Sequence, residues 1–231
     1  MTQERIKSEF DEIARLSAVH GSDDRYDEFL VHLVPSQASS VLDVGCGLGR
    51  LSKSLATSNR RVIGIDFSSE MIVRAKALED NSASLKFHCA DFLTTQFEEP
   101  AFDSVISVAT LHHLPLQTAV ERMTELVRPG GTLIIHDLRA ESNFMERISS
   151  VMAGVVNCFS RFHRTGQFME NAALRKAWLN HGGSETYLTM EQVKLLAASF
   201  SPAAKTYKHW FWRYTVVWQK PERWQAEPRA N

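Results

Sequence analysis

The chain has little of what would place it outside a reducing aqueous compartment. It holds only three cysteines, Cys46, Cys89 and Cys158, which are scattered and match neither a metal-ligand spacing nor a disulfide framework. No apolar run approaches the length of a bilayer span. The opening residues MTQERIKSEF lack the apolar region of a signal peptide. We therefore expect a cytoplasmic protein with no membrane partner and no metal site.

An excess of charge of either sign is also missing. Lys and Arg number 26 against 27 Asp and Glu, which gives a formal net charge of −1. This balance does not direct the protein towards nucleic acid or an acidic membrane. With 44% hydrophobic and 23% charged residues, the composition is that of an ordinary globular protein. The length of 231 residues favours one large α/β domain over two full domains.

From residue 40 onwards, short apolar runs alternate with segments of helical spacing. Strands are predicted over 40–44, 61–65, 84–90, 102–109 and, after the turn RPGG at 128–131, over 131–138. Helices are predicted over 48–58, 68–79 and 116–128. This alternation indicates parallel strands joined by crossover helices that cover both faces of a sheet. Two further runs, 203–209 and 212–219, are joined tightly and predict an antiparallel pair.

The remaining segments complete a single domain. Residues 1–35 carry two apolar stripes of helical spacing and predict an N-terminal helical cap before the core at 36–138. Residues 139–200 predict a helical insert, with an apolar helix at 144–159, and a last helix for which Thr189 and Gln192 occupy capping-box positions. The strand pair then fills 201–220, and 221–231 is a tail.

The stretch VLDVGCGLGR, residues 41–50, places three glycines where the first strand passes into a helix. Gly45, Gly47 and Gly49 are spaced G-x-G-x-G, one residue short of the G-x-G-x-x-G of dinucleotide-binding loops. Glycine permits positive φ angles and close approach of a ligand to the backbone. Asp66 ends the second strand, where a carboxylate can accept hydrogen bonds from both hydroxyls of a ribose. Asp91 follows the third strand, where a carboxylate can accept one from an adenine amino group.

Taken together, these motifs resemble those of a known family. VLDVGCGLGR, VIGIDFSSEMI, FHCADF, FDSVISVATLHHL and RPGGTLIIHDL are similar, in order and spacing, to motifs of the class I S-adenosylmethionine-dependent methyltransferases, in the branch with the ubiquinone/menaquinone-type small-molecule enzymes. The resemblance implies a Rossmann-like α/β fold, with a seven-stranded, mostly parallel sheet, an antiparallel C-terminal strand and helices on both faces. It also implies S-adenosylmethionine as cofactor and S-adenosylhomocysteine as product.

The resemblance assigns roles to residues of this sequence. Asp43 and the loop with Gly45, Cys46, Gly47 and Gly49 would face the methionine part of the cofactor, and Asp66 would hold its ribose. The adenine would lie between Phe67 and Met71 and against Asp91 and Phe92, while the sulfonium would lie beside Val108 and Ala109. Tyr26, in the segment placed over the cofactor, would touch the methionine carboxylate.

Several of these residues also have plainer interpretations. Asp43 could cap the following helix, and Cys46 could be a small residue in a tight loop rather than a nucleophile. Asp66 could be a solvated carboxylate at a strand end. Phe92 and Met71 could belong to the core alone.

Candidates for acid–base chemistry follow two strands. His112 and His113 come after the fourth strand, and His136 and Asp137 end the fifth, so all four are expected near the carboxyl edge of the sheet. Histidine titrates in the range that a general base needs. A base is needed only if the methyl acceptor holds its proton at neutral pH. The two histidines after the fourth strand could instead be structural or face the cofactor.

We expect a small organic methyl acceptor, for which the insert would form part of the pocket. The aromatic and basic residues near the C-terminus favour no nucleic acid partner, because Trp212, Tyr214, Val216 and Trp218 alternate along one strand face, as core residues do. Three alternatives stay open: a nicotinamide-dependent oxidoreductase, a non-catalytic cofactor-binding regulatory protein, and an RNA methyltransferase.

Overall fold

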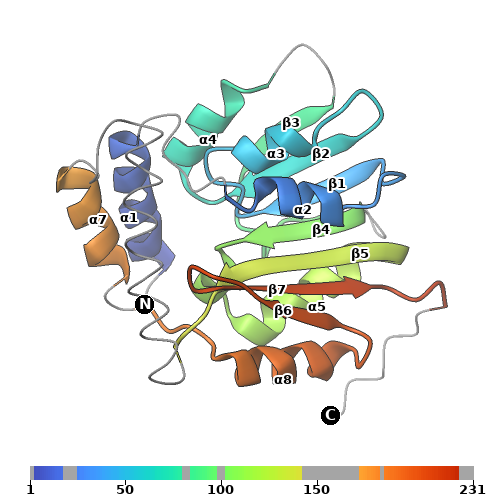
Figure 1. Ribbon diagram of the computed structural model, residues 1–231. Coiled ribbons are helices and arrows are strands. Elements are labelled where there is room, and N and C mark those ends of the chain that lie inside the picture. The colour runs from blue at the N-terminus through green and yellow to red at the C-terminus, as the bar shows by residue number, and fades with distance from the viewer. Residues whose placement is uncertain are drawn as a thin grey trace.

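A single mixed sheet forms the centre of the molecule. The computed structural model describes residues 3–17, 25–79, 84–97, 102–141, 172–182 and 185–223. The sheet has seven strands in the order β3-β2-β1-β4-β5-β7-β6 (Figure 1). The apolar helix predicted at 144–159 lies outside the described residues.

The strands form as the sequence pattern predicts. β1 (Ser40–Val44), β2 (Arg61–Asp66), β3 (Leu85–Cys89), β4 (Phe102–Val108) and β5 (Val127–Leu138) pair in parallel. β7 (Arg213–Gln219) runs antiparallel to both β5 and β6 (Lys205–Lys208), so six strands point one way and one points back. The predicted fold class, a Rossmann-like sheet with one reversed strand, is confirmed.

β1 occupies the place where the strand order reverses. It pairs with β2 on one side, as in Val41↔Val62, and with β4 on the other, as in Val41↔Ser104. In open α/β sheets such a reversal opens a crevice at the carboxyl ends of the strands, where ligands bind. In Figure 1 these ends point towards the cap helices α1 (Gln3–Leu16) and α7 (Ala172–Gly182).

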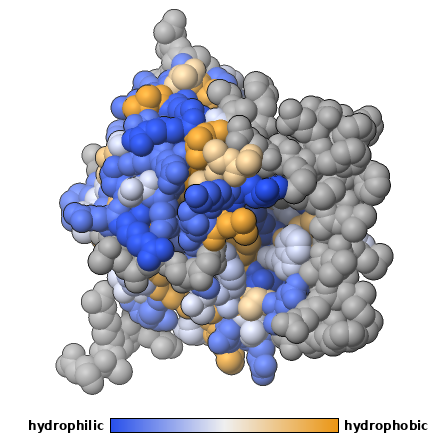
Figure 2. Space-filling view, turned by 90° about the vertical axis from the view of Figure 1, so that its left-hand side faces the viewer, coloured by the Kyte–Doolittle hydropathy of each residue, from blue (hydrophilic) through white to orange (hydrophobic). Residues whose placement is uncertain are grey.

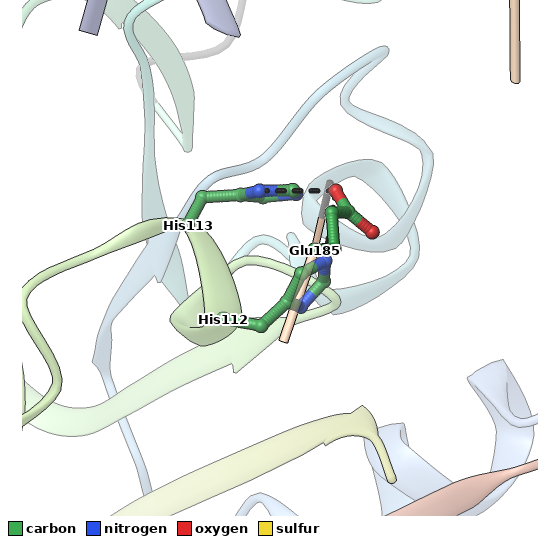
Figure 3. A group of neighbouring side chains, drawn as sticks. All are labelled: His112, His113 and Glu185. Atoms are coloured by element: carbon green, nitrogen blue, oxygen red, sulfur yellow. Dashed lines mark ion pairs between the residues drawn. The ribbon is translucent and has the colours of Figure 1, made fainter. Parts of the chain in front are cut away.

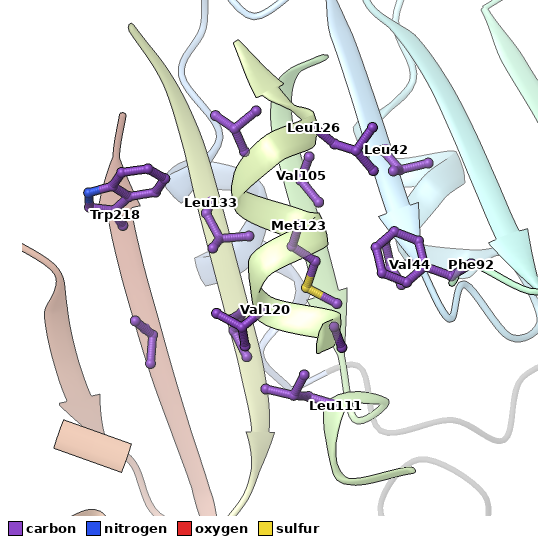
Figure 4. Close-up of a cluster of buried hydrophobic side chains, with 14 of the residues drawn as sticks. Leu42, Val44, Phe92, Val105, Leu111, Val120, Met123, Leu126, Leu133 and Trp218 are labelled. Carbon is purple, nitrogen blue, oxygen red and sulfur yellow. The ribbon is translucent and has the colours of Figure 1, made fainter. Parts of the chain in front are cut away.

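Helices cover both faces of the sheet, and apolar side chains fill the space between. On one face lie α2 (Asp27–Leu33), α3 (Arg50–Leu55) and α4 (Ser69–Lys76), and on the other α5 (Leu116–Leu126) and α8 (Met190–Phe200). Val120 and Met123 of α5 pack against Leu133 and Trp218 of the sheet (Figure 4). β4 is buried along nearly its whole length because both of its faces are covered.

Two features of the chain refine the predicted boundaries. RPGG is not a separate turn, because β5 already starts at Val127. The pairing of β4 with β5 passes from Phe102↔Val127 to Ser104↔Thr132, so β5 has extra residues opposite β4. These residues form an irregular bulge, in which Gly130 has a φ of 77°. The capping box of α8 is present: the Gln192 amide N donates to Thr189 Oγ1 (3.3 Å), and the Thr189 amide N donates to Gln192 Oε1 (2.8 Å).

The cap helices lie side by side beyond the carboxyl edge of the sheet (Figure 1). α1 (Gln3–Leu16) and α7 (Ala172–Gly182) share a small apolar cluster with Met71 of α4. Seen from this side, the described surface is largely hydrophilic, and hydrophobic residues form separate small areas (Figure 2). No helix among the described residues is long and apolar enough to cross a membrane.

Candidate active site

A cavity of about 860 Å³ lies at the carboxyl edge of the sheet, between the strand ends and the cap helices. Phe10 and Ile13 of α1 and Trp178 of α7 close one side of it. Thirteen residues predicted from the sequence line the other sides: Asp43, Gly45, Cys46, Gly47, Asp66, Phe67, Met71, Asp91, Phe92, Val108, Ala109, His112 and His113. Residues from four strand ends therefore meet around one space.

Four predicted residues lie outside the lining of this cavity. Gly49 occupies the N-cap position of α3, at φ 77°. Tyr26 donates a hydrogen bond from its hydroxyl to the Trp210 carbonyl (2.6 Å), and its ring lies 4.7 Å from that of His136. His136 and Asp137 alternate along β5, so their side chains leave opposite faces of the strand. Asp137 nevertheless reaches the cavity wall through His112.

The glycine loop turns tightly at two positions. Gly45 and Gly47 have φ angles of 73° and 52°, in the left-handed region that favours glycine. A Cβ added at Gly45 would lie 2.0 Å from Thr110 Oγ1, so the fold itself excludes a side chain there. A Cβ added at Gly47 would meet no atom within 4 Å. Gly47 therefore exposes bare backbone to open space in the cavity.

Asp66 fixes the loop from the end of β2. Its Oδ2 accepts a hydrogen bond from the Gly47 amide N (2.9 Å), and its Oδ1 accepts one from the Ser68 amide N (2.8 Å). Burial raises the pKa of this carboxyl, and the backbone hydrogen bonds oppose the rise. Since a carboxylate oxygen can accept more than one hydrogen bond, both oxygens can still accept from a ligand.

Asp43 does not cap the helix that follows it. The N-cap of α3 is Gly49, which provides no side-chain cap, and Asp43 instead accepts a hydrogen bond from the Ser52 hydroxyl (2.5 Å). Its side chain is fully buried, and this burial, with the nearby charge of Asp66, raises its pKa to about 6. Asp43 thus places a titratable carboxyl directly beneath the glycine loop.

At the other end of the cavity three imidazoles surround one carboxylate oxygen. Glu185 Oε1 lies 3.6 Å from His112 Nε2, 3.3 Å from His113 Nδ1 and 2.7 Å from His181 Nε2. The side chains of His112, His113 and Glu185 point towards one another, from the short helix η1 (Leu111–His113) and the segment after α7 (Figure 3). On its far side His112 contacts Asp137, with 2.6 Å between Nδ1 and Oδ1.

Comparison with known proteins identifies the central segment. Residues 41–131 match the family described as a methyltransferase domain. The chain therefore has the sequence signature of a methyltransferase domain over this segment. Its fold is that of the Rossmann-like class I methyltransferases: the crystal structure of the N-methyltransferase NodS from Bradyrhizobium japonicum in complex with S-adenosyl-L-homocysteine superposes with a TM-score of 0.58 at 17% identity, over 93% of this chain and 99% of that one.

Relatives of this chain include proteins of two bacteria. An uncharacterized methyltransferase of Mycobacterium tuberculosis is 39% identical over 111 residues, which are 48% of this chain and 56% of the relative. A ubiquinone biosynthesis O-methyltransferase of Xylella fastidiosa is 31% identical over 161 residues, 68% of this chain and 65% of the relative. The chain therefore spans little more than half the length of the mycobacterial relative and about two thirds of the second.

The two cavity histidines, His112 and His113, differ in their protonation. Burial lowers the pKa of His112, but the carboxylates of Asp137 and Glu185 outweigh it and raise the pKa to about 9. Burial, together with the charge of His112, lowers the pKa of His113 to about 4. Burial opposes ionisation of Glu185, yet its contacts with His112, His181 and Tyr187 lower its pKa well below the ordinary value. At neutral pH a charged His112 thus lies beside a neutral His113.

His136 lies in different surroundings. It is buried, its Nδ1 lies 2.9 Å from Thr215 Oγ1, and burial with the charge of Arg213 lowers its pKa to about 3. Among the four acid–base candidates, only His112 and His113 line the cavity, and Asp137 contacts it through His112.

Several other predicted residues both line the cavity and contribute to the packing or backbone geometry around it. Burial raises the pKa of Cys46 well above its ordinary value, so this thiol stays protonated and is no activated nucleophile. Met71 and Phe92 are only 6% and 5% exposed, and they line the cavity while belonging to apolar clusters. Ala109 directly follows β4 at φ 51°, a strained angle for a residue with a Cβ, and its amide N donates to the His136 carbonyl (2.8 Å).

Glu185 and His181 were not among the predicted site residues. Both lie in the segment NAALRKAWLNHGGSE, which we predicted only as part of the helical insert. A single acid and a single histidine at this distance from His112 and His113 carry no local signal, because the contact depends on how α7 crosses the cavity. The ion pair between Arg50 and Asp27, which also line the cavity, was missed for the same reason.

Proposed function

We propose that this methyltransferase transfers a methyl group from S-adenosylmethionine to a small organic acceptor by in-line displacement. The observation that carries the proposal is one cavity with two chemically different ends: the glycine loop with Asp43 and Asp66, and the group of His112, His113 and Glu185. Bound at the first end, the cofactor supplies a methyl group already activated on a sulfonium. The G-x-G-x-G spacing and the family match both favour this function over a nicotinamide-dependent oxidoreductase.

The first end of the cavity fits the cofactor. The open space at Gly47 admits a ligand against the backbone, and the remaining lone pairs of Asp66 would accept hydrogen bonds from ribose hydroxyls. Asp91 Oδ1 accepts a hydrogen bond from the Leu93 amide N (2.8 Å), and the Asp91 carboxylate would bind the adenine edge beside Phe92. Phe67 and Met71 would flank the ring, and Val108 and Ala109 would lie beside the sulfonium.

The second end of the cavity would hold the acceptor. Asp137 keeps His112 oriented through two contacts, from the His112 amide N (3.0 Å) and from Nδ1 (2.6 Å). A positively charged His112 would stabilise an ionised acceptor oxygen and so lower the pKa of a hydroxyl that must lose its proton. The likeness to an O-methyltransferase of ubiquinone biosynthesis supports an oxygen acceptor. Phe10 and Trp178 would exclude water from the reacting groups.

The decisive test is calorimetric titration with S-adenosylhomocysteine, run beside NAD. We expect micromolar binding of the first and none of the second. Asp66→Ala should weaken binding about 30- to 150-fold, which corresponds to the loss of roughly 2–3 kcal/mol of hydrogen bonding to the ribose. Glu121→Ala, at an exposed position of α5, is the matched control and should bind as the wild type does.

Two results would contradict the proposal. Wild-type protein that binds NAD but not S-adenosylhomocysteine would overturn the cofactor. Unchanged affinity in a folded Asp66→Ala variant would remove Asp66 from the ribose site. Because Asp66 also holds two loop amides, the unfolding temperature of each variant is recorded with the titration.

A further inference from the structure

We propose that His112, His113 and Glu185 form a binding site for a divalent transition-metal ion at the acceptor end of the cavity. Each of the three residues offers one ligand atom, and these three atoms all lie within 4.8 Å of one another. Among them, His112 Nε2 and His113 Nδ1 both approach Glu185 Oε1. Four-coordinate zinc with bonds of about 2.0–2.1 Å separates its ligand atoms by about 3.4 Å. The two distances from Glu185 Oε1, 3.6 and 3.3 Å, lie on either side of this value.

The burial of the three ligands distinguishes the site from a surface cluster. Their side chains are 7%, 9% and 4% exposed. Among the described residues, Glu185 Oε1 has no hydrogen-bond partner of good geometry, although three imidazoles surround it. His181 Nε2, 2.7 Å away, likewise has none. Glu185 Oε1 thus has an ion pair with His181 but no well-directed hydrogen bond from the described part of the chain, and a bound cation would supply the partner that it lacks there.

The groups behind the ligands hold them as the groups around metal sites do. Asp137 Oδ1 lies 2.6 Å from His112 Nδ1, which leaves Nε2 of this ring directed towards Glu185. A carboxylate on the second nitrogen of a metal-binding histidine is the common arrangement and fixes its tautomer. The Tyr187 hydroxyl donates a hydrogen bond to Glu185 Oε2, so Oε1 is the oxygen that would bind the ion.

The ligand set indicates the kind of metal. Two imidazoles and one carboxylate suit zinc or ferrous iron, whereas magnesium and calcium prefer oxygen ligands throughout. All three residues line the cavity, so a position on the ion would face it. Given the proposed function, that position would take an oxygen of the acceptor and lower the pKa of its hydroxyl, with the ion in place of the proton on His112.

Metal binding is measured first on the full chain, stripped with a chelator. Titration with Zn²⁺ by calorimetry should show one site with a Kd of about 10⁻⁶ M or tighter. Co²⁺ should give the intense visible absorption of a four-coordinate ion, and Zn²⁺ should displace it. His113→Ala and Glu185→Gln should each weaken binding at least about 100-fold, because even loss of an outer partner costs 10- to 100-fold. His88→Ala, which removes an exposed histidine on β3, should leave binding unchanged.

S-adenosylhomocysteine is titrated into the same samples, so the two proposals fail separately. No Zn²⁺ site, or a site that survives in both ligand variants, overturns the metal site even when S-adenosylhomocysteine binds. A Zn²⁺ site lost in both variants supports it even when S-adenosylhomocysteine does not bind. A variant counts only if its circular dichroism and unfolding temperature match the wild type; if Glu185→Gln fails this requirement, His113→Ala decides.

Discussion

Replacing Gly47 by alanine separates the role of the glycine loop in ligand binding from its role in folding. The residue has a φ of 52°, and an added Cβ would meet no atom within 4 Å. The only cost to the fold is therefore the left-handed backbone, about 1–2 kcal/mol for a residue with a side chain. In a domain of this size that lowers the unfolding temperature by about 2–8 °C.

The same substitution should also weaken the binding of the cofactor. The new methyl group would occupy the space in which we place the ligand, at a position that also lines the cavity. We expect S-adenosylhomocysteine to bind at least about tenfold more weakly, equivalent to about 1.4 kcal/mol. Calorimetric titration and thermal unfolding by circular dichroism measure the two effects on one sample.

Gly45→Ala is the matched comparison. Its φ of 73° carries a similar backbone cost, but its Cβ would lie 2.0 Å from Thr110 Oγ1 and 2.4 Å from Thr110 Cγ2. Overpacking adds about 1–3 kcal/mol, so this variant should unfold at a clearly lower temperature than Gly47→Ala. If Gly47→Ala were folded and bound S-adenosylhomocysteine with wild-type affinity, the placement of the cofactor against the backbone at Gly47 would be wrong.

Two further predictions concern a buried acid and a helix cap. Burial raises the pKa of Asp43 from 3.8 to about 6, so the folded state binds the proton of this carboxyl more tightly than the unfolded state does. This difference stabilises the folded state by about 3 kcal/mol below about pH 4, and the stabilisation is lost as the pH rises through 6. The free energy of unfolding from urea titrations at pH 4 and 7 should therefore fall less with pH in Asp43→Asn than in the wild type; equal falls would contradict the assignment. Thr189→Ala removes the side-chain cap of α8 and should cost about 1 kcal/mol in the same assay, whereas Ser199→Ala, within the helix, should cost less.

The sequence predicted those parts of the fold and site that depend on neighbouring residues. Strands and helices followed from local apolar periodicity, and the glycine loop from one strand-to-helix junction. Asp66 and Asp91 could be placed together because parallel strands end at the same edge of a sheet.

What the sequence could not predict depends on side-chain direction and on distant contacts. His136 and Asp137 are adjacent, but strand alternation sends one towards Thr215 and Tyr26 and the other towards His112. Glu185 reaches the histidines only because α7 crosses the cavity beside α1. The bulge at Gly130 likewise depends on the register with β4.

The order of the strands also determines which two strands form the edges of the sheet. β3 and β6 are its outermost strands, with five and four residues. Lys86 on β3 and Lys205 and Lys208 on β6 are exposed. Short edges with charged side chains resist the addition of a strand from another molecule, because pairing would bury charged ammonium groups. The same two strands that complete the sheet therefore also protect the protein against edge-to-edge aggregation.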